Sequence, residues 1–237
     1  MNGTALLYTA VAASANVIGA VAVVSHSRWS VRALDNMVAL SAGFMISVAL
    51  LDLAPDAILT HGPSAALIIL IGYLLVHLSL HTLAPHFHFG EEVHHVTKVA
   101  SFSALAGLML HTFVDGVAIA SGFGVSEGLG ILVFMAILLH KLPEGLAISS
   151  LFLAAGESRG AALAASGALA ASSLLGALLT QRVPLLQEYG LPLAAGVTLY
   201  VGASNLVPEF QGKKGWQLPV SFFLGCALYY FARRLVH

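Results

Sequence analysis

The stretch from His111 to Glu144 decides the fold, because two long apolar segments each carry a short polar cluster near their middle. The first cluster reads His111-Thr-Phe-Val-Asp115-Gly and the second reads His140-Lys-Leu-Pro-Glu144-Gly. In both clusters a histidine precedes a carboxylate by four residues, a spacing that places both side chains on one face of a helix, about one turn apart. Two such pairs on neighbouring helices would direct two imidazoles and two carboxylates to one point. That donor set suits a divalent transition metal.

The composition predicts a membrane protein. Of the 237 residues, 58% are hydrophobic and only 9% are charged, whereas a soluble domain carries roughly 25% charged residues. The net charge of −1 gives no indication of nucleic-acid binding. The single cysteine, Cys226, cannot form an internal disulfide. We therefore expect an all-α membrane protein with a single transmembrane domain over residues 1–237.

Apolar runs of about 20 residues are long enough to span a bilayer. The sequence predicts eight of them, separated by Gly, Pro and charged residues, with one of the turns at 122–124. The predicted spans are 5–25, 34–54, 64–83, 99–121, 126–155, 160–181, 189–209 and 216–234.

The distribution of basic residues predicts that both termini lie outside the cytoplasm of a cell inner or plasma membrane. With that topology the inner side holds six basic residues: Arg28, Arg32, Lys98, Arg159, Lys213 and Lys214. The outer side holds three: Arg182, Arg233 and Arg234.

A short internal sequence similarity indicates inverted repeats. Leu53-Ala-Pro-Asp56 ends the second span and Leu206-Val-Pro-Glu209 ends the seventh, and each follows a Gly-containing apolar run. In an eight-span topology these two spans run in opposite directions. Spans 1–3 and 6–8 would then be inverted copies around a central pair formed by spans 4 and 5, an arrangement typical of transporters.

The polar clusters need a reason to lie in the membrane, since each ionisable group at the bilayer centre costs about 2.5–3.5 kcal/mol on insertion scales. One interpretation is a structural ion-pair network that joins Lys141 to Glu144 or Asp115, although such networks stabilise poorly compared with apolar packing. The other is a metal site or a proton path. Pro143 lies within the second cluster and should leave the carbonyl of Leu139 without its helical donor. The glycines that follow each carboxylate, Gly116 and Gly145, should permit close helix packing.

The two clusters resemble the fourth and fifth helices of the ZIP (Zrt/Irt-like protein) family of divalent-metal transporters. Eight spans and a His-rich loop between the third and fourth helices are similar to that family as well, so the resemblance covers nearly the whole chain. It implies metal uptake toward the cytoplasm through a site built by these two helices, and it places His111, Asp115, His140 and Glu144 at that site. A methionine of the second helix contributes in some members, and Met45 is the matching residue; simple packing is the alternative role.

Three positions depart from the pattern of the binuclear prokaryotic members. Those members have Asn after the first histidine, Asp after the first ligand of the fifth helix and an acid on the seventh helix. This chain has Thr112, Lys141 and Ser204 or Asn205 at those places. A protonated lysine cannot ligate a metal and would repel a second dication. We therefore expect one metal, with Lys141 supplying part of the charge that a second metal supplies elsewhere.

The loop of about residues 82–98 should be cytoplasmic, and it is rich in histidines that could capture a released ion: His86, His88, His94 and His95. A solvated loop with chance histidines is the alternative.

The sequence thus predicts a transporter and no enzyme. Its substrate would be Zn²⁺, or Fe²⁺, Mn²⁺, Co²⁺ or Cd²⁺, with no resident cofactor. Its partners would be the metal ion and the lipid bilayer, with a homodimer left open. Because imidazole and carboxylate ligands must be deprotonated, metal binding should weaken at low pH. An intramembrane zinc-dependent hydrolase is the alternative from another class, although a His-Glu-x-x-His string is absent from the sequence. Axial haem ligation by His111 and His140 is a further alternative, and the neighbouring carboxylates argue against it.

Overall fold

The computed structural model describes residues 3–25, 31–83 and 98–236, and all regular structure within them is helical. In the first half of the chain the elements are α1 (Gly3–Val24), α2 (Val31–Val48), π-helical turn η1 (Ala49–Leu53), α3 (Ala54–His61), α4 (Ser64–Leu83) and α5 (Lys98–Val125). In the second half they are α6 (Glu127–Ala154), α7 (Arg159–Thr180), α8 (Pro184–Tyr200), π-helical turn η2 (Val201–Leu206), α9 (Val207–Gln211) and α10 (Gln217–Val236).

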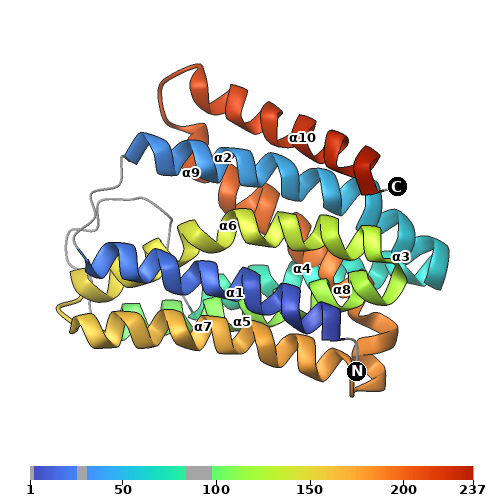
Figure 1. Ribbon diagram of the computed structural model, residues 1–237, viewed down its shortest axis with the longest axis horizontal. Helices are drawn as coiled ribbons and strands as arrows, with labels where there is room; N and C mark the ends of the chain where they lie inside the picture. Colours follow the sequence, from blue (N-terminus) through green and yellow to red (C-terminus); the bar gives the residue numbers. More distant parts are fainter. Residues whose placement is uncertain (1–2, 26–30, 84–97, 237) are drawn as a thin grey trace.

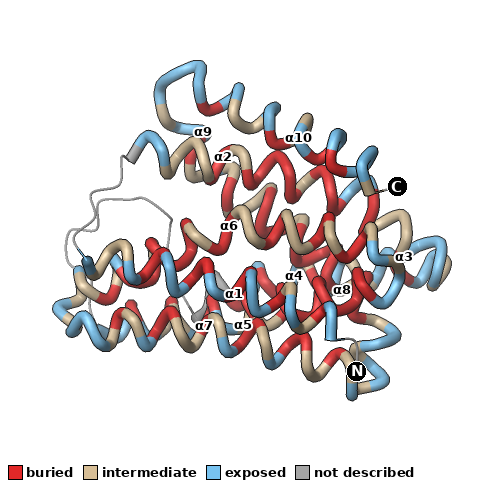
Figure 2. The backbone as a smooth tube through the Cα atoms, in the orientation of Figure 1, coloured by how far each residue is buried: buried red, intermediate tan, exposed pale blue. Residues whose placement is uncertain are grey.

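Within these described residues, six helices are long and apolar enough to cross a membrane. They are α1, α5, α6, α7 and the continuous helices Arg32–His61 and Pro184–Gln211. The apolar part of α4, Ser64–Ser79, is shorter, and α10 carries Arg233 and Arg234 in its last turn. Figure 2 shows the exposed surface on the outer helices and the buried residues between them. Much of that exposed surface is apolar, as at Leu67, Leu70 and Leu74 of α4, which is what a face against lipid requires. The chain is therefore a multi-pass membrane protein.

The two similar segments at the ends of the second and seventh spans have the same local structure, a π-helical turn followed by a proline. In η1 the main-chain N–H of Ala54 bonds to Ala49 O, and in η2 that of Val207 bonds to Gly202 O. These wider turns carry the helix through Pro55 and Pro208, whose rings would collide with the carbonyl four residues earlier in a regular α-helix. The second and seventh predicted spans consequently extend past their prolines, to His61 and to Gln211.

Other helix ends also differ from the sequence-based expectation. The turn expected at 122–124 was wrong: α5 continues to Val125, and Ser126 alone separates it from α6, where its hydroxyl accepts the N–H of Leu129 at 3.1 Å. Gly122 is used for close packing instead, since a Cβ there would lie 3.2 Å from the Cα of Gly130 in the next helix. The seventh span starts earlier than expected, at Pro184, because a proline fits the first turn of a helix.

The helices pack as two bundles. The first bundle consists of α1, α5, α6 and α7, and the second of α2–α3, α4, α8–α9 and α10. Figure 1 shows α10 beside α2 at one edge of the molecule and α1 with α7 at the opposite edge. The main contacts between the bundles are made by α5 with α8 and by α2 with α6. The residues of the predicted central pair thus lie in one bundle, with α1 and α7 packed tightly against them.

Reciprocal glycines join the helices within each bundle. A Cβ on any of them would overlap the main chain of the partner helix, so only glycine permits such close contact. The pairs are Gly19 and Gly145 for α1 with α6, Gly116 and Gly176 for α5 with α7, Gly43 and Gly225 for α2 with α10, and Gly72 and Gly196 for α4 with α8. The close packing expected at Gly116 and Gly145 is therefore confirmed.

Candidate metal centre

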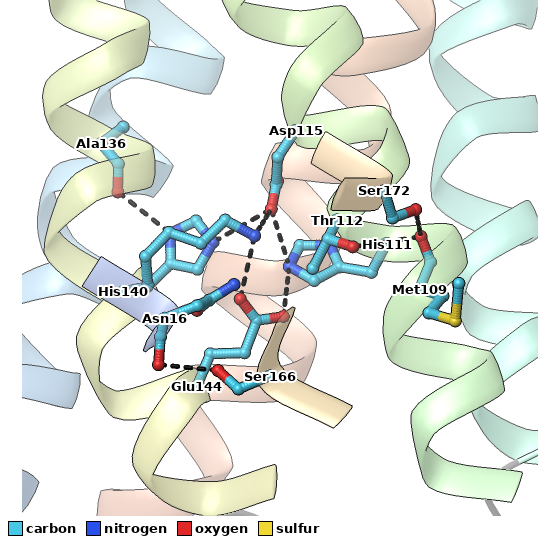
Figure 3. A network of polar contacts seen from close by, with 11 residues as sticks. Asn16, Met109, His111, Thr112, Asp115, Ala136, His140, Glu144, Ser166 and Ser172 are labelled. Atoms are coloured by element: carbon cyan, nitrogen blue, oxygen red, sulfur yellow. Dashed lines mark hydrogen bonds and ion pairs between the residues drawn. The ribbon is translucent and has the colours of Figure 1, made fainter. Parts of the chain in front are cut away.

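The two imidazoles and two carboxylates predicted from the sequence come together between α5 and α6. One ligand atom from each of His111, Asp115, His140 and Glu144 lies within 4.8 Å of the others, and all four residues are buried. Within the part of the chain that the structure describes, no other group of three or more His, Cys, Asp or Glu comes this close. Figure 3 shows both imidazoles turned toward the carboxylate of Asp115. The Nε2 atoms of His111 and His140 are each 3.4 Å from Asp115 Oδ2.

Helical geometry and one side-chain hydrogen bond set the orientation of the histidines. Each His-x-x-x-acid pair occupies one face of its helix, and the two helices run in opposite directions so that the faces oppose each other. The Nδ1 of His140 lies 3.0 Å from the carbonyl of Ala136, one turn earlier. With the proton on that nitrogen, Nε2 presents its lone pair to the centre of the cluster, the arrangement that metal-binding histidines usually have.

Pro143 frees a carbonyl, as expected, and α2 provides a donor for it. The hydroxyl of Ser41 lies 2.9 Å from Leu139 O and 2.7 Å from Met37 O, and it can donate to either. The proline is accommodated inside α6 without ending the helix. The second bundle therefore contacts the first beside the cluster through a polar contact that depends on the proline.

Lys141 is fully buried, and its ammonium contacts both carboxylates. Its Nζ is 2.7 Å from Asp115 Oδ2 and 2.9 Å from Glu144 Oε2. The ion-pair network considered from the sequence is therefore present, with Lys141 bonded to both acids. The charges of the two carboxylates and the ammonium sum to −1 while both imidazoles are neutral, so the network leaves the site anionic.

Asn16 of α1 belongs to the same network, and sequence reasoning missed it. It is fully buried, and with its amide nitrogen facing the acceptors it donates to Glu144 Oε2 at 3.2 Å and to the main-chain oxygen of Lys141. The main-chain carbonyl of Asn16 accepts a hydrogen bond from the hydroxyl of Ser166 at 2.7 Å. The available signal was that Asn16 is the one carboxamide in the apolar run 5–24.

Two buried atoms of the cluster have no hydrogen-bond partner, His111 Nδ1 and Glu144 Oε1. Buried polar atoms usually have one, so an unsatisfied carboxylate oxygen here needs an explanation. Beside it lies a small cavity of about 10 Å³, lined by both histidines, Glu144 and residues of the second bundle. That volume is close to the minimum that holds one water-sized guest.

The positions that differ from the binuclear pattern have separate surroundings. The hydroxyl of Thr112 donates to Met109 O at 3.1 Å, so it is occupied within its own helix. Ser204 pairs with the hydroxyl of Tyr73 at 2.6 Å. Asn205 lines the small cavity together with His111 and Glu144. Of the two residues considered on the seventh span, Asn205 is thus the one that faces the site.

The remaining predicted site residues are placed as follows. Met45 is fully buried in α2 and lies against η2 near Gly202, and it does not line the small cavity. Its role as a ligand stays a prediction. His86, His88, His94 and His95 lie outside the described residues.

The arrangement can hold a dication with modest adjustment. In a tetrahedral site with metal–ligand distances of about 2.0–2.2 Å, the ligand atoms are roughly 3.4 Å apart. The present separations reach up to 4.8 Å, so the ligand atoms would have to draw closer around the ion. Mixed nitrogen and oxygen donors suit Zn²⁺ and its neighbours in the first transition row.

The fold and the site define a class: a multi-pass α-helical membrane protein with a buried His/carboxylate cluster. Comparison with known proteins then identifies the family. Residues 84–232 match the family model described as ZIP zinc transporter, which covers more than half of the chain. The chain belongs to the ZIP family, as the sequence resemblance predicted.

Curated relatives carry the same family name. The chain is 30% identical over 138 residues to zinc transporter ZIP13 of Pongo abelii, which covers 55% of this chain and 42% of that protein. It is 34% identical over 125 residues to zinc transporter SLC39A7 of Homo sapiens, covering 47% of this chain and 26% of that protein. The matched region thus spans less than half the length of these relatives. Both are named as transporters rather than enzymes.

Proposed function

We propose that the protein transports a divalent transition metal, zinc in the first instance, across the membrane toward the cytoplasm through a single midplane site. The observation that carries the proposal is the convergence of four buried ligand atoms from α5 and α6. Membership of the ZIP family supports transport as the activity. The names of the curated relatives support zinc as the substrate.

Charge supports one metal per site. Two carboxylates and the Lys141 ammonium sum to −1. One dication brings the sum to +1, whereas two would bring it to +3 in a buried environment, where uncompensated charge is costly. The small cavity beside the cluster has room for one water-sized guest.

Lys141 also suits a site that must release its ion. Because its ammonium lies within 2.9 Å of both carboxylates, it can pair with them once the metal has left. A transport site has to bind strongly enough to admit an ion and weakly enough to release it. The lysine lowers the cost of the metal-free state and so favours release.

The packing indicates which parts move. The site residues belong to the first bundle, while Val201, Asn205 and Leu206 of the second bundle close one side of the small cavity. We infer that alternating access arises when the first bundle shifts as a unit against the second. The reciprocal glycines hold α1 and α7 tightly to α5 and α6, so the moving unit is larger than the central pair expected from the sequence.

The proposed topology has eight spans and both termini outside the cytoplasm. It is supported by eight helical rods, counting each π-helical turn with its flanking helices, in the described ranges. Equivalent π turns before Pro55 and Pro208 and the matched glycine pairs support an inverted repeat of spans 1–3 and 6–8. The histidines of loop 82–98 would then receive the ion on the cytoplasmic side.

Zinc uptake into proteoliposomes tests the proposal. The variant His140→Ala removes one imidazole and should abolish uptake. His77→Ala, on an exposed part of α4, serves as the matched control and should transport at the wild-type rate. Undiminished uptake by purified, folded His140→Ala would disprove the site.

A further inference from the structure

A second cavity lies at the end of the molecule where α3, α5 and α7 end and α8 begins. Its volume is about 490 Å³, and it is lined from the first bundle by the ends of α1, α5 and α7 and from the second by α3 and α8. Like the small cavity at the central cluster, it lies between the two bundles. In the proposed topology this end faces outward, where the ion arrives.

One wall of this cavity carries a buried hydroxyl without a partner. Ser121 of α5 is 8% exposed, and its Oγ makes no hydrogen bond. Gly190 of α8 leaves room for it, since a Cβ on that glycine would collide with Ser121 Oγ. Ser121 comes six residues after Asp115 on the same helix, a rise of about 9 Å. Ser121 therefore lines the cavity at less than two turns from the metal centre, with its hydroxyl turned toward Gly190.

The opposite walls carry an imidazole and a carboxylate. His61 ends α3, and its Nδ1 lies 3.3 Å from Ala57 O, so Nε2 remains available as a ligand. Its ring packs against that of Tyr189, with centroids 6.0 Å apart. The neighbouring residue Glu188 is exposed and lines the same cavity. Gln187, which also lines it, is held by a hydrogen bond of 2.9 Å from its Nε2 to Gln181 O.

These donors are of the same chemical types as those of the central cluster, but they are fewer and more exposed to solvent. One imidazole, one carboxylate and neutral oxygens can attract a hydrated dication without removing all of its water. Such a site binds weakly and exchanges fast, as an entrance must if the ion is to move on. A carboxylate beside the entrance also raises the local concentration of cations.

We propose that this cavity is a staging site, in which His61 and Glu188 hold a hydrated divalent transition-metal ion before it reaches the central cluster. The inference rests on the proposed transport function. It adds a second, weak ion position that belongs to the route and lies apart from the transport site.

Initial rates of ⁶⁵Zn²⁺ uptake into proteoliposomes over a range of zinc concentrations test this site. The double variant His61→Ala/Glu188→Gln should raise KM about tenfold, at the low end of electrostatic steering effects, and leave the maximal rate unchanged. Glu127→Gln removes the same charge from an exposed position at the same end that does not line the cavity, so its KM should equal that of the wild type. A double variant with wild-type KM, or with a reduced maximal rate at unchanged KM, overturns the proposal.

Two further variants keep the test independent of folding and of the transport proposal. If the double variant fails to elute as a folded protein, Glu188→Gln alone should still raise KM by about threefold, and an unchanged KM overturns the staging site. The variant Asp115→Asn tests the transport site separately. Loss of uptake in Asp115→Asn with wild-type KM in the cavity variants refutes the staging site alone, whereas normal uptake in Asp115→Asn refutes the transport site itself.

Discussion

The ammonium of Lys141 on α6 lies 2.7 Å from Oδ2 of Asp115 on α5, the same oxygen that both imidazoles approach. A fixed positive charge thus lies between the carboxylate of α5 and that of Glu144 on α6. The pairing explains how two carboxylates can remain ionised in a buried site. We therefore expect the lysine to limit the site to one metal.

Lys141→Asp should convert the site to one that binds two metals. The change replaces an ammonium with a third carboxylate, so the charge sum falls from −1 to −3 and two dications bring it to +1. Elemental analysis of the purified, zinc-loaded protein should give two zinc ions per chain against one in the wild type. Lys98→Asp, an exposed position whose side chain pairs with Glu157, should still give one. A single zinc in Lys141→Asp would show that the lysine does not set the stoichiometry.

Asn205→Asp should tighten binding at the cost of turnover. Asn205 lines the cavity at the cluster, so an added carboxylate there would hold the dication more strongly in its bound state. Both KM and the maximal rate of uptake should fall. Ser204→Ala changes a neighbour whose hydroxyl bonds to Tyr73, and both of its constants should stay within about twofold of the wild type. An unchanged maximal rate in Asn205→Asp would place this residue outside the release step.

Gly145→Ala should destabilise the protein although it adds a single methyl group. The new Cβ would overlap the main chain of Asn16 in α1, and overpacking of this kind typically costs about 1–3 kcal/mol. Thermal unfolding in detergent should show a lower Tm. Gly167→Ala is the matched control, because a Cβ there meets nothing within 4 Å. Equal Tm values for the two variants would contradict the close contact of α1 with α6.

Asp52 connects α10 to η1 through a buried network. Its carboxylate accepts the hydroxyl of Tyr229 at 2.6 Å and Nε of Arg233 at 2.8 Å, and it is 4% exposed. Asp52→Asn should lower the free energy of unfolding by about 1–3 kcal/mol, because it weakens hydrogen bonds made by a buried charge.

The more exposed pair of Lys213 with Asp35, at 2.6 Å, connects α2 to the segment before α10 and provides the comparison. Asp35→Asn should cost at most about 1 kcal/mol, as exposed ion pairs generally do. Chemical denaturation in detergent micelles measures both. If Asp35→Asn lowers the free energy of unfolding as much as Asp52→Asn does, burial is not the reason that the Asp52 network stabilises the protein.

The clustering of the four residues could be predicted from the sequence because its signals are local. Four residues separate each histidine from its carboxylate, and that spacing alone fixes a shared helix face at His111 and Asp115, as at His140 and Glu144. Pro143 likewise predicts a free carbonyl, because proline has no N–H to donate to the residue four positions earlier. The third predicted span, 64–83, coincides with α4.

The remainder depends on contacts between distant parts of the chain. Nothing in the sequence around Asn16 indicates that its amide meets Glu144, since that contact arises only from the packing of α1 on α6. Prolines normally suggest helix ends, and the π turns that carry the helix past Pro55 and Pro208 could not be read from propensities. The division into two bundles is also a tertiary property, because the apolar composition of the six membrane-capable helices does not show which of them pack together.

Zinc K-edge X-ray absorption on the zinc-loaded protein tests the central claim most directly. The account predicts nitrogen and oxygen ligands at about 2.0–2.2 Å, multiple-scattering features from two imidazoles, and their partial loss in His111→Ala and in His140→Ala. A zinc–zinc vector near 3.5–4 Å, the spacing of two-metal sites, or a spectrum without imidazole that stays unchanged in both variants, would contradict it.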